Sequence, residues 1–265
     1  MKTQFVIALC SILMLVGGVT PFAAPLDPDL VIYFDYEEFK GDAVVDKSGR
    51  GHDGKINGKV TQVDGGKFGK AGKFAQGTFL DLDGPNIPKE DIPTEGMSVV
   101  AWINVEAISD MAIFNARASD ATWLVHPEAR GGGNYRWLLR GAGGAGIFDI
   151  RAGKNKMNEW VHYAGTYDQK RKPGAILFIN GTPVGEDNST GLKIAPDWGM
   201  GARVGYNIDN NRPFTGLMDE LNIWKRGLSE DEVKAIMDNG VADFLAVDAK
   251  GKLATQWGMI KSSRR

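Results

Sequence analysis

The sequence predicts an all-β fold, a sandwich of two antiparallel sheets with one short helix near the C-terminus. Short apolar segments recur between residues 30 and 224 at the spacing of sandwich strands, separated by Gly, Asn, Asp and Pro. The 35 glycines follow no period, which indicates a turn-rich β protein rather than a low-complexity chain. Helical periodicity is convincing only after Ser229, so the helix is expected to follow the last strand.

The predicted strands are short apolar or alternating runs bounded by turn residues. Asn180 and Gly181 both tolerate positive φ, so they predict a two-residue hairpin turn leading to Val184. In chain order the predicted strands are Leu30–Phe34, Phe79–Leu82, Ser98–Val105, Met111–Phe114, Thr122–Val125, Arg136–Leu139, Ile147–Ile150, Trp160–Tyr167, Ala175–Ile179, Arg203–Tyr206 and Thr215–Trp224.

The last predicted strand runs directly into the helix. Its apolar residues alternate with polar ones, the pattern of a strand with one buried face. Ser229, with Glu232 three residues later, forms a capping box at the start of the helix. Beyond Gly240 the periodicity dissolves, so we predict a domain over residues 25–243 and an appended tail over residues 244–265.

Residues 1–24 have the features of an export signal. Lys2 supplies the positive charge, and Phe5–Val19 is an apolar run too short and too rich in glycine for a typical membrane span. We expect cleavage and a secreted or cell-surface protein without a membrane span, the alternative being an uncleaved anchor. Cleavage removes Cys10, the chain's only cysteine, so the mature domain depends on its core, or on its core and a metal.

Charge and motifs exclude several classes of function. The formal charge is −2 with both signs interspersed, and no basic stripe is present to neutralise a phosphate backbone. We therefore expect no nucleic-acid partner. The three histidines fit no zinc spacing, and no phosphate-binding glycine loop precedes a helix.

Several segments, in the same order along the chain, resemble the laminin-G-like branch of the concanavalin A-like lectins and glucanases. They are Tyr33–Asp35, Val45–Gly54, Gly69–Phe74, Met97–Ile103, Asn158–Asp168, Leu177–Gly181 and Met218–Ser229. The resemblance implies a concanavalin A-like jelly roll of two antiparallel sheets. It also implies an exported domain that binds glycans or proteins without catalysis.

The resemblance further implies a structural calcium ion. In related laminarinase-type sandwiches, an acidic residue of the first strand and an aspartate of the last strand hold the ion. The matching positions here are Asp35, with Glu37 as a substitute, and Asp219. Calcium prefers hard oxygen ligands, and an ion joining both ends of the chain suits a domain without disulfides. The alternative is that these acids bond to turn amides.

Glycosidase chemistry requires two carboxyl groups placed about 5 to 9.5 Å apart across the scissile bond. The catalytic glucanases of this superfamily carry the pair on one strand, as Glu-x-Asp-x-x-Glu or a close variant. No such run occurs here, so we predict that the protein is not an enzyme. A divergent glycoside hydrolase is the least favoured alternative.

Two regions are candidate ligand sites, an aromatic patch on neighbouring strands and a polar loop before the last strand. Tyr135 and Trp137 share one face of their strand because they are two residues apart. The competing interpretations are core packing for the strand aromatics and an ordinary turn for the loop. The predicted ligand-binding residues are Asn115, Arg117, Trp123, Tyr135, Trp137 and Arg140 in the patch, and Asn207, Asp209 and Asn210 in the loop.

We therefore predict an exported, non-catalytic module that recognises carbohydrate or a glycosylated protein surface, with a structural Ca²⁺ ion. The alternative is a protein–protein adhesion or assembly module that uses the loops and sheet edges of the same fold. If Trp137 belongs to a sugar site, its replacement by alanine weakens saccharide binding without unfolding the domain.

Overall fold

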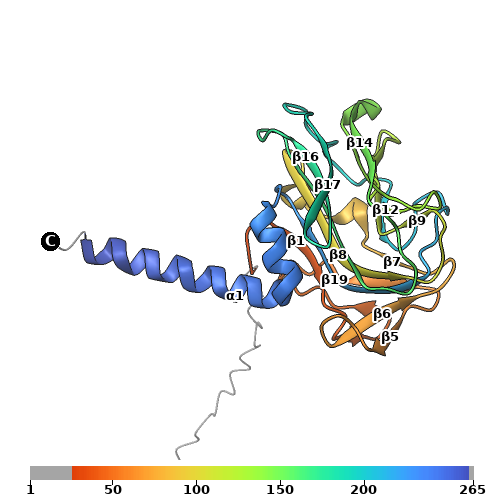
Figure 1. Ribbon diagram of the computed structural model, residues 1–265, viewed down its shortest axis with the longest axis horizontal. Coiled ribbons are helices and arrows are strands. Elements are labelled where there is room, and N and C mark those ends of the chain that lie inside the picture. Colours follow the sequence, from red (N-terminus) through yellow and green to blue (C-terminus); the bar gives the residue numbers. More distant parts are fainter. Residues whose placement is uncertain (1–25, 263–265) are drawn as a thin grey trace, which may run out of the picture.

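The computed structural model describes residues 26–262, with side chains described as far as residue 247. Two antiparallel sheets pack face to face, and helix α1 (Glu230–Ser262) begins against the outer side of one of them (Figure 1). This arrangement confirms the predicted jelly-roll sandwich. The predicted signal peptide, residues 1–24, lies outside the described residues.

The first sheet is built around its two longest strands, β8 (Gly96–Val105) and β19 (Gly216–Trp224), which are buried along almost their whole length. Their inner faces pack against the second sheet, and part of their outer faces lies under α1. The strand order is β17 (Thr182–Asp187), β16 (Ala175–Ile179), β15 (Val161–Asp168), β8, β19, β6 (Lys70–Phe74) and β5 (Thr61–Asp64), and β1 (Leu30–Phe34) pairs with β19.

The second sheet consists of shorter strands, and short 3-10 helices occur in the loops: η1 (Gly84–Asn86), η2 (Lys89–Asp91) and η3 (Ala142–Gly144). The strand order is β2 (Phe39–Lys40), β3 (Ala43–Val44), β4 (Gly54–Asn57), β7 (Phe79–Asp81), β18 (Gly201–Val204), β10 (Phe114–Arg117), β11 (Trp123–Val125), β13 (Tyr135–Arg140), β12 (Glu128–Ala129) and β9 (Met111–Ala112), and β14 (Gly146–Ala152) pairs with β13.

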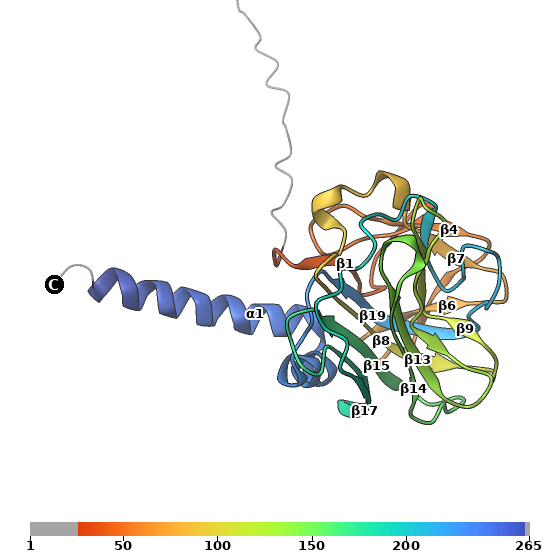
Figure 2. The ribbon, with the colours of Figure 1, turned by 90° about the horizontal axis from the view of Figure 1, so that it is seen from above.

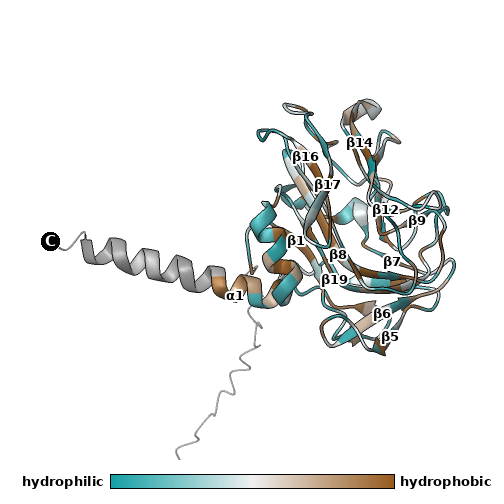
Figure 3. Cartoon of the chain, in the orientation of Figure 1, coloured by the Kyte–Doolittle hydropathy of each residue, from teal (hydrophilic) through white to brown (hydrophobic). Residues whose placement is uncertain are grey.

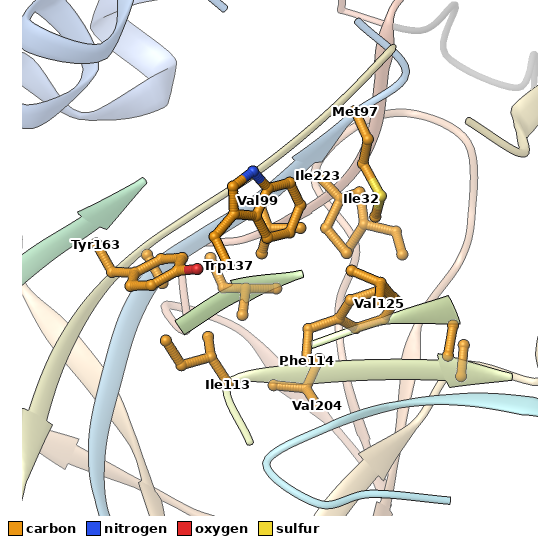
Figure 4. Packing of buried hydrophobic residues seen from close by; sticks show 14 of the residues in the cluster. Ile32, Met97, Val99, Ile113, Phe114, Val125, Trp137, Tyr163, Val204 and Ile223 are labelled. Atoms are coloured by element: carbon orange, nitrogen blue, oxygen red, sulfur yellow. The ribbon is translucent and has the colours of Figure 1, made fainter. Parts of the chain in front are cut away.

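The hydrophobic core lies between the two sheets. Figure 4 shows Trp137 of β13 among buried side chains that come from both sheets, including Ile32, Val99 and Phe114. Gly165 on the opposite sheet makes room for the indole, since a Cβ at that position would lie 2.5 Å from Trp137 Cδ2. Figure 3 shows hydrophobic and hydrophilic residues alternating along the strands, as expected for strands with one buried face.

Helix α1 begins as predicted. The backbone N–H of Ser229 donates to Glu232 Oε2 (2.8 Å), and the N–H of Glu232 donates to Ser229 Oγ (3.3 Å), which confirms the capping box. Gly240 interrupts the helix with a φ of 77°, and the chain then continues as helix to Ser262, extending away from the sandwich (Figures 1 and 2).

The helix is longer than the short one predicted, because it continues through residues 244–262 of the segment that the sequence analysis set apart as a tail. The helix resumes because Val241 and Leu245 bury their side chains on the outer side of the first sheet. The N–H of Val241 also donates to Glu220 Oε2 (2.6 Å), so the last strand provides an acceptor where the helix restarts. No helix within residues 26–262 combines the length and hydropathy needed to cross a membrane.

Candidate functional site

Two of the predicted ligand-binding aromatics lie in the core. Tyr135 and Trp137 do share one face of β13, but it is the inner face, and neither side chain has exposed surface. The indole Nε1 of Trp137 donates to the carbonyl of Thr166 across the sandwich (3.1 Å). A ring without exposed surface cannot stack on a sugar, so the prediction is wrong for these two residues.

Trp123 and Arg117 do reach the surface, on the outer face of the second sheet. They pair across β11 and β10, and both are partly exposed. The Arg117 guanidinium lies over the Trp123 ring, 4.2 Å from its centroid, and Arg117 Nε donates to the carbonyl of Ala121 (2.9 Å). Arg140, at the end of β13, is also partly exposed. This part of the predicted patch is available to a ligand.

Asn115 is fully buried and holds the predicted loop in place. Its Oδ1 accepts the N–H of Ile208 (3.0 Å), and its Nδ2 donates to the carbonyl of Val125 (3.0 Å). Both functions of the amide are thus used within the protein, so the prediction of Asn115 as a ligand contact is corrected to a supporting role. Asn115 therefore anchors the loop of residues 207–212 on the outer face of the second sheet.

The loop itself offers exposed polar groups. Asp209 and Asn210 are exposed, whereas Asn207 is buried and its side-chain amide has no hydrogen-bond partner among the described residues. The backbone folds back on itself, because the N–H of Asn207 donates to the carbonyl of Asn211 (3.1 Å). Asp209 and Asn210 can therefore face a ligand, and Asn207 cannot without a change in the loop.

Sequence reasoning missed a second aromatic group beside this loop. The Arg203 guanidinium lies 4.2 Å from the centroid of Phe79, and Phe79 packs against Tyr206 with 5.8 Å between ring centroids. Arg203 Nη1 also donates to Asn210 Oδ1 (2.9 Å). The signal was available in β18, where Arg203 stands between the buried residues Ala202 and Val204 and therefore points outward.

A pocket of about 530 Å³ lies beside the C-terminal end of the loop, where Asn211 and Arg212 line it. Its polar wall combines a carboxylate, a guanidinium, two amides and two hydroxyls, and such a set can both donate to and accept from a polar ligand. Arg212 adopts a φ of 54°, a conformation typical of a tight turn. The lining residues are Gln76, Ala107, Ser109, Asp110, Asn211, Arg212, Pro213 and Thr215.

Glu128, a fully buried carboxylate, stands behind this pocket. It accepts hydrogen bonds from His126 Nδ1 (3.0 Å) and Arg130 Nη1 (2.7 Å), and Arg212 Nε lies 3.4 Å from its Oε1. Burial alone would raise the pKa of Glu128, but the hydrogen bonds from His126 and Arg130 and the charge of Arg212 lower it to about 2. Glu128 is therefore ionised and holds Arg212 at the pocket wall, where Asp110 also lies 3.8 Å from Arg212 Nε.

Two of the predicted calcium ligands, Glu37 and Asp219, accept hydrogen bonds from the glycine-rich segment that joins β5 to β6. Asp219 Oδ2 accepts the N–H of Phe68 (2.8 Å), and Glu37 Oε1 accepts the N–H of Lys70 (2.5 Å). Asp35 Oδ1 accepts the N–H of Glu37 (3.0 Å). Burial, with the neighbouring charge of Glu220, raises the pKa of Asp219 to about 7.

These carboxylates fit a calcium ion only in part. The oxygens named above already accept amide protons. Across the part of the chain that the structure describes, no three acidic, histidine or cysteine side chains gather closely enough to hold a metal ion. The carboxylates of Glu37 and Asp219 thus hold the segment between β5 and β6 in place by hydrogen bonds to its backbone.

Comparison with known proteins agrees with this architecture. A profile described as the concanavalin A-like lectin/glucanases superfamily, of the Laminin_G_3 type, matches residues 83–234, more than half of the chain. No curated protein matches the chain.

Solved structures share the fold at low sequence identity. The binding domain of Paraclostridial Mosquitocidal Protein 1 is 17% identical with a TM-score of 0.57, and the match covers 80% of this chain and 52% of that one. Domain 4 of AbnA, an extracellular GH43 arabinanase from Geobacillus stearothermophilus in complex with arabinotriose, is 20% identical with a TM-score of 0.53, covering 79% and 98%. A Trypanosoma rangeli sialidase is 12% identical with a TM-score of 0.57, covering 78% and 32%. The chain thus spans about half the length of the toxin domain and nearly all of the arabinanase domain.

Proposed function

Because the chain belongs to the laminin-G-like family of the concanavalin A-like lectin/glucanase superfamily, we propose that it is an exported, non-catalytic module that binds carbohydrate or a glycosylated surface. The observation that carries the proposal is the polar pocket beside the loop of residues 207–212. Sugar hydroxyls both donate and accept hydrogen bonds, so they suit a wall that places Asp110 next to Arg212. The arabinanase domain, which matches over nearly its whole length, has the same fold and was solved with a bound trisaccharide.

The carboxyl groups near the pocket support binding without catalysis. A glycosidase needs both an acid and a base or nucleophile, and of the residues that line the pocket Asp110 alone carries a carboxyl group. Glu128 lies nearby, but its pKa of about 2 keeps it ionised, and its oxygens accept hydrogen bonds from His126 and Arg130. It therefore has no proton to donate to a glycosidic oxygen.

The first test is a glycan-array screen of the mature chain, residues 25–265, followed by calorimetry with the best ligand. We expect Asp110→Asn and Asn211→Ala each to weaken binding about tenfold, since each removes polar contacts worth on the order of 1 to 2 kcal/mol. Glu106→Gln is the matched control, because Glu106 lies close by in the chain, pairs with Lys73 and is not part of the pocket wall.

The control variant should bind like the wild type, and all three variants should melt like the wild type. If both pocket variants bind the ligand as tightly as the wild type, the pocket is not the binding site. If no glycan on the array binds and the mature chain instead binds a non-glycosylated protein, the result would favour the adhesion module.

We also propose that calcium binds near Asp35, Glu37 and Asp219. The proposal is supported by the charge of this region, because Asp219 and Glu220 are buried and no cationic side chain of the described residues lies within ion-pair distance of either. Burial, with a smaller contribution from neighbouring carboxylates, raises the pKa of both groups, and a divalent cation would favour their ionised forms.

Calcium at 100 times its dissociation constant would stabilise the native state by about 2.7 kcal/mol. We therefore expect chelator to lower the Tm by about 5 °C or more, measured by thermal unfolding with and without calcium. The Asp219→Asn variant should lose this difference, whereas Asp64→Asn, an exposed acid of the adjacent strand β5, should keep it. An unchanged Tm in chelator would rule out the ion.

A further inference from the structure

The wall of the pocket carries no net charge. Of the eight described residues that line it, Asp110 and Arg212 carry the charges, and Asp110 Oδ2 lies 3.8 Å from Arg212 Nε. Glu106, which precedes the lining residue Ala107, is paired with Lys73. The other polar side chains of the wall are uncharged: Gln76, Ser109, Asn211 and Thr215.

A second pair of opposite charges lies behind the wall. The buried Glu128 carboxylate lies 3.4 Å from Arg212 Nε and accepts hydrogen bonds from Arg130 Nη1 (2.7 Å) and His126 Nδ1 (3.0 Å). Arg130 Nη2 in turn lies 3.3 Å from Asp110 Oδ2. Two carboxylates and two guanidiniums thus alternate in one cluster, and their formal charges cancel.

Charges at the edge of this cluster do not change the balance at the wall. Arg136 Nη1 lies 3.5 Å from the buried carboxylate, but its Nε and Nη2 donate to Asp149 (2.7 and 2.8 Å). Arg151 also contacts Asp149 (2.9 Å), and 51% of its side chain is exposed, so water screens its charge. In the adjoining loop and strand, Asp209 and Arg203 carry opposite charges, and neither lines the pocket.

The charged pair of the wall keeps hydrogen-bonding capacity for a ligand. A carboxylate has about four lone-pair sites, and Asp110 accepts one backbone hydrogen bond, from the N–H of Gly131 (2.8 Å). Arg212 faces both carboxylates through Nε, and its two Nη atoms have no partner among the described residues.

This arrangement suits hydroxyl groups better than ionised groups. A hydroxyl can accept from Arg212 and donate to Asp110 at the same time. A ligand carboxylate would be attracted by one of these groups and repelled by the other. It would also lose its hydration without gaining a free counter-charge, and such a loss is unfavourable.

We infer that the pocket selects an uncharged, hydroxyl-bearing sugar unit over its uronate, and that Glu128 is the residue that determines this selectivity. The inference rests on the proposed function and names the class of ligand. Glu128 has no exposed surface and therefore touches no ligand. It acts through Arg212, whose charge it offsets from behind, and without this carboxylate the wall would attract acidic sugars.

The test compares neutral sugars with their uronates on the full mature chain by calorimetry at neutral pH. The matched probes are galacto-, manno- and gluco-oligosaccharides and the corresponding uronates. A glycan of another class that binds on the array is oxidised at its primary hydroxyl groups to give its own uronate. The wild type should bind the neutral member about tenfold or more tightly. Its affinity for that member should change less than about twofold between about 50 and about 500 mM NaCl, since no net charge is paired on binding.

Two variants should reduce this preference. Glu128→Gln keeps the size of the side chain and removes its charge, and it should raise affinity for the uronate about tenfold relative to the neutral partner. Because this variant is expected to lose stability, thermal unfolding must first show that it is folded at the temperature of the titration. Asp110→Asn, a change at a partly exposed residue, should weaken binding of the neutral sugar and strengthen binding of the uronate.

Glu95→Gln is the matched control. It removes the same charge from an exposed carboxylate that pairs with Lys170 (3.1 Å) and Lys193 (3.4 Å). Glu95 precedes the start of β8 and the pocket residue Ala107 follows its end, so the ten residues of the strand place them about 30 Å apart. This variant should keep the preference of the wild type.

The outcomes separate the inference from the function on which it rests. A wild type that binds a uronate as tightly as its neutral partner, or more tightly, overturns the inference and leaves carbohydrate binding standing. An unchanged preference in Asp110→Asn and in folded Glu128→Gln also overturns it, and Asp110→Asn decides alone if Glu128→Gln does not fold. An equal change in Glu95→Gln overturns it too, because the effect would then be one of overall charge. Failure to bind any saccharide contradicts the proposed function itself.

Discussion

Replacing Trp137 with alanine is expected to destabilise the domain by about 3 to 5 kcal/mol, the range measured for loss of a large buried aromatic side chain. The indole is fully buried, packs 5.7 Å from the Phe148 ring and donates to the carbonyl of Thr166. Removing it leaves a large cavity and a buried carbonyl without this donor. Urea unfolding monitored by circular dichroism measures the loss.

Trp123→Ala is the control, because Trp123 is partly exposed on the opposite face of the same sheet. Its stability should change by about 1 kcal/mol or less. If Trp137→Ala instead retained wild-type stability and lost saccharide binding, the indole would have to be accessible to ligand, and the core assignment would be wrong. This expectation replaces the one drawn from the sequence alone.

Replacing Glu128 with glutamine is expected to destabilise the domain by about 3 kcal/mol at neutral pH, since it leaves buried and partly buried cations without their shared anion. The pKa of Glu128 falls from 4.5 to about 2 in the folded state, which corresponds to a similar energy. A carboxyl group with a lowered pKa stabilises the fold above its unfolded pKa. That contribution is lost as the pH falls from about 4.5 toward 2.

Urea unfolding at pH 7 and at pH 2.5 measures this effect. The difference between wild type and Glu128→Gln should be largest at pH 7 and should shrink at the acidic pH. Glu106→Gln, the exposed control, should remain near the wild type at both values. A Glu128→Gln protein as stable as the wild type at pH 7 would show that the arginines find other partners.

Most strands of five or more residues were predicted from the sequence, because burial gives them a recognisable apolar pattern. Ala175–Ile179 and Leu30–Phe34 were predicted with the bounds that the structure gives them. The Asn180–Gly181 turn is also confirmed, with φ values of 50° and 72°. The short strands β2 to β5 and β12 were not predicted, because two to four residues with mixed polarity carry little periodicity and depend on their neighbours for pairing.

The alternation of residues along a strand does not reveal which of its two faces points into the core. A spacing of two residues places Tyr135 and Trp137 together but does not say which side of the sheet they occupy. In the structure, the inner side of β13 meets Gly165, and that contact depends on the packing of two sheets.

The pocket could not be predicted for a related reason. Its residues come from three separate segments, around positions 76, 107–110 and 211–215. No local pattern links these segments, and only the fold brings them together. The loop of residues 207–212 was identified because asparagine and aspartate cluster there, and that local signal survives in the structure as exposed Asp209 and Asn210.

Because the first strand pairs with the last one, both ends of the domain lie on the same sheet. Leu30 lies opposite Trp224, and α1 leaves the same sheet on its outer side, so both ends of the sandwich emerge from one side (Figures 1 and 2). Arg117, Arg203 and the loop of residues 207–212 lie on the outer face of the other sheet. The candidate ligand-binding residues on that face therefore point away from both ends of the sandwich.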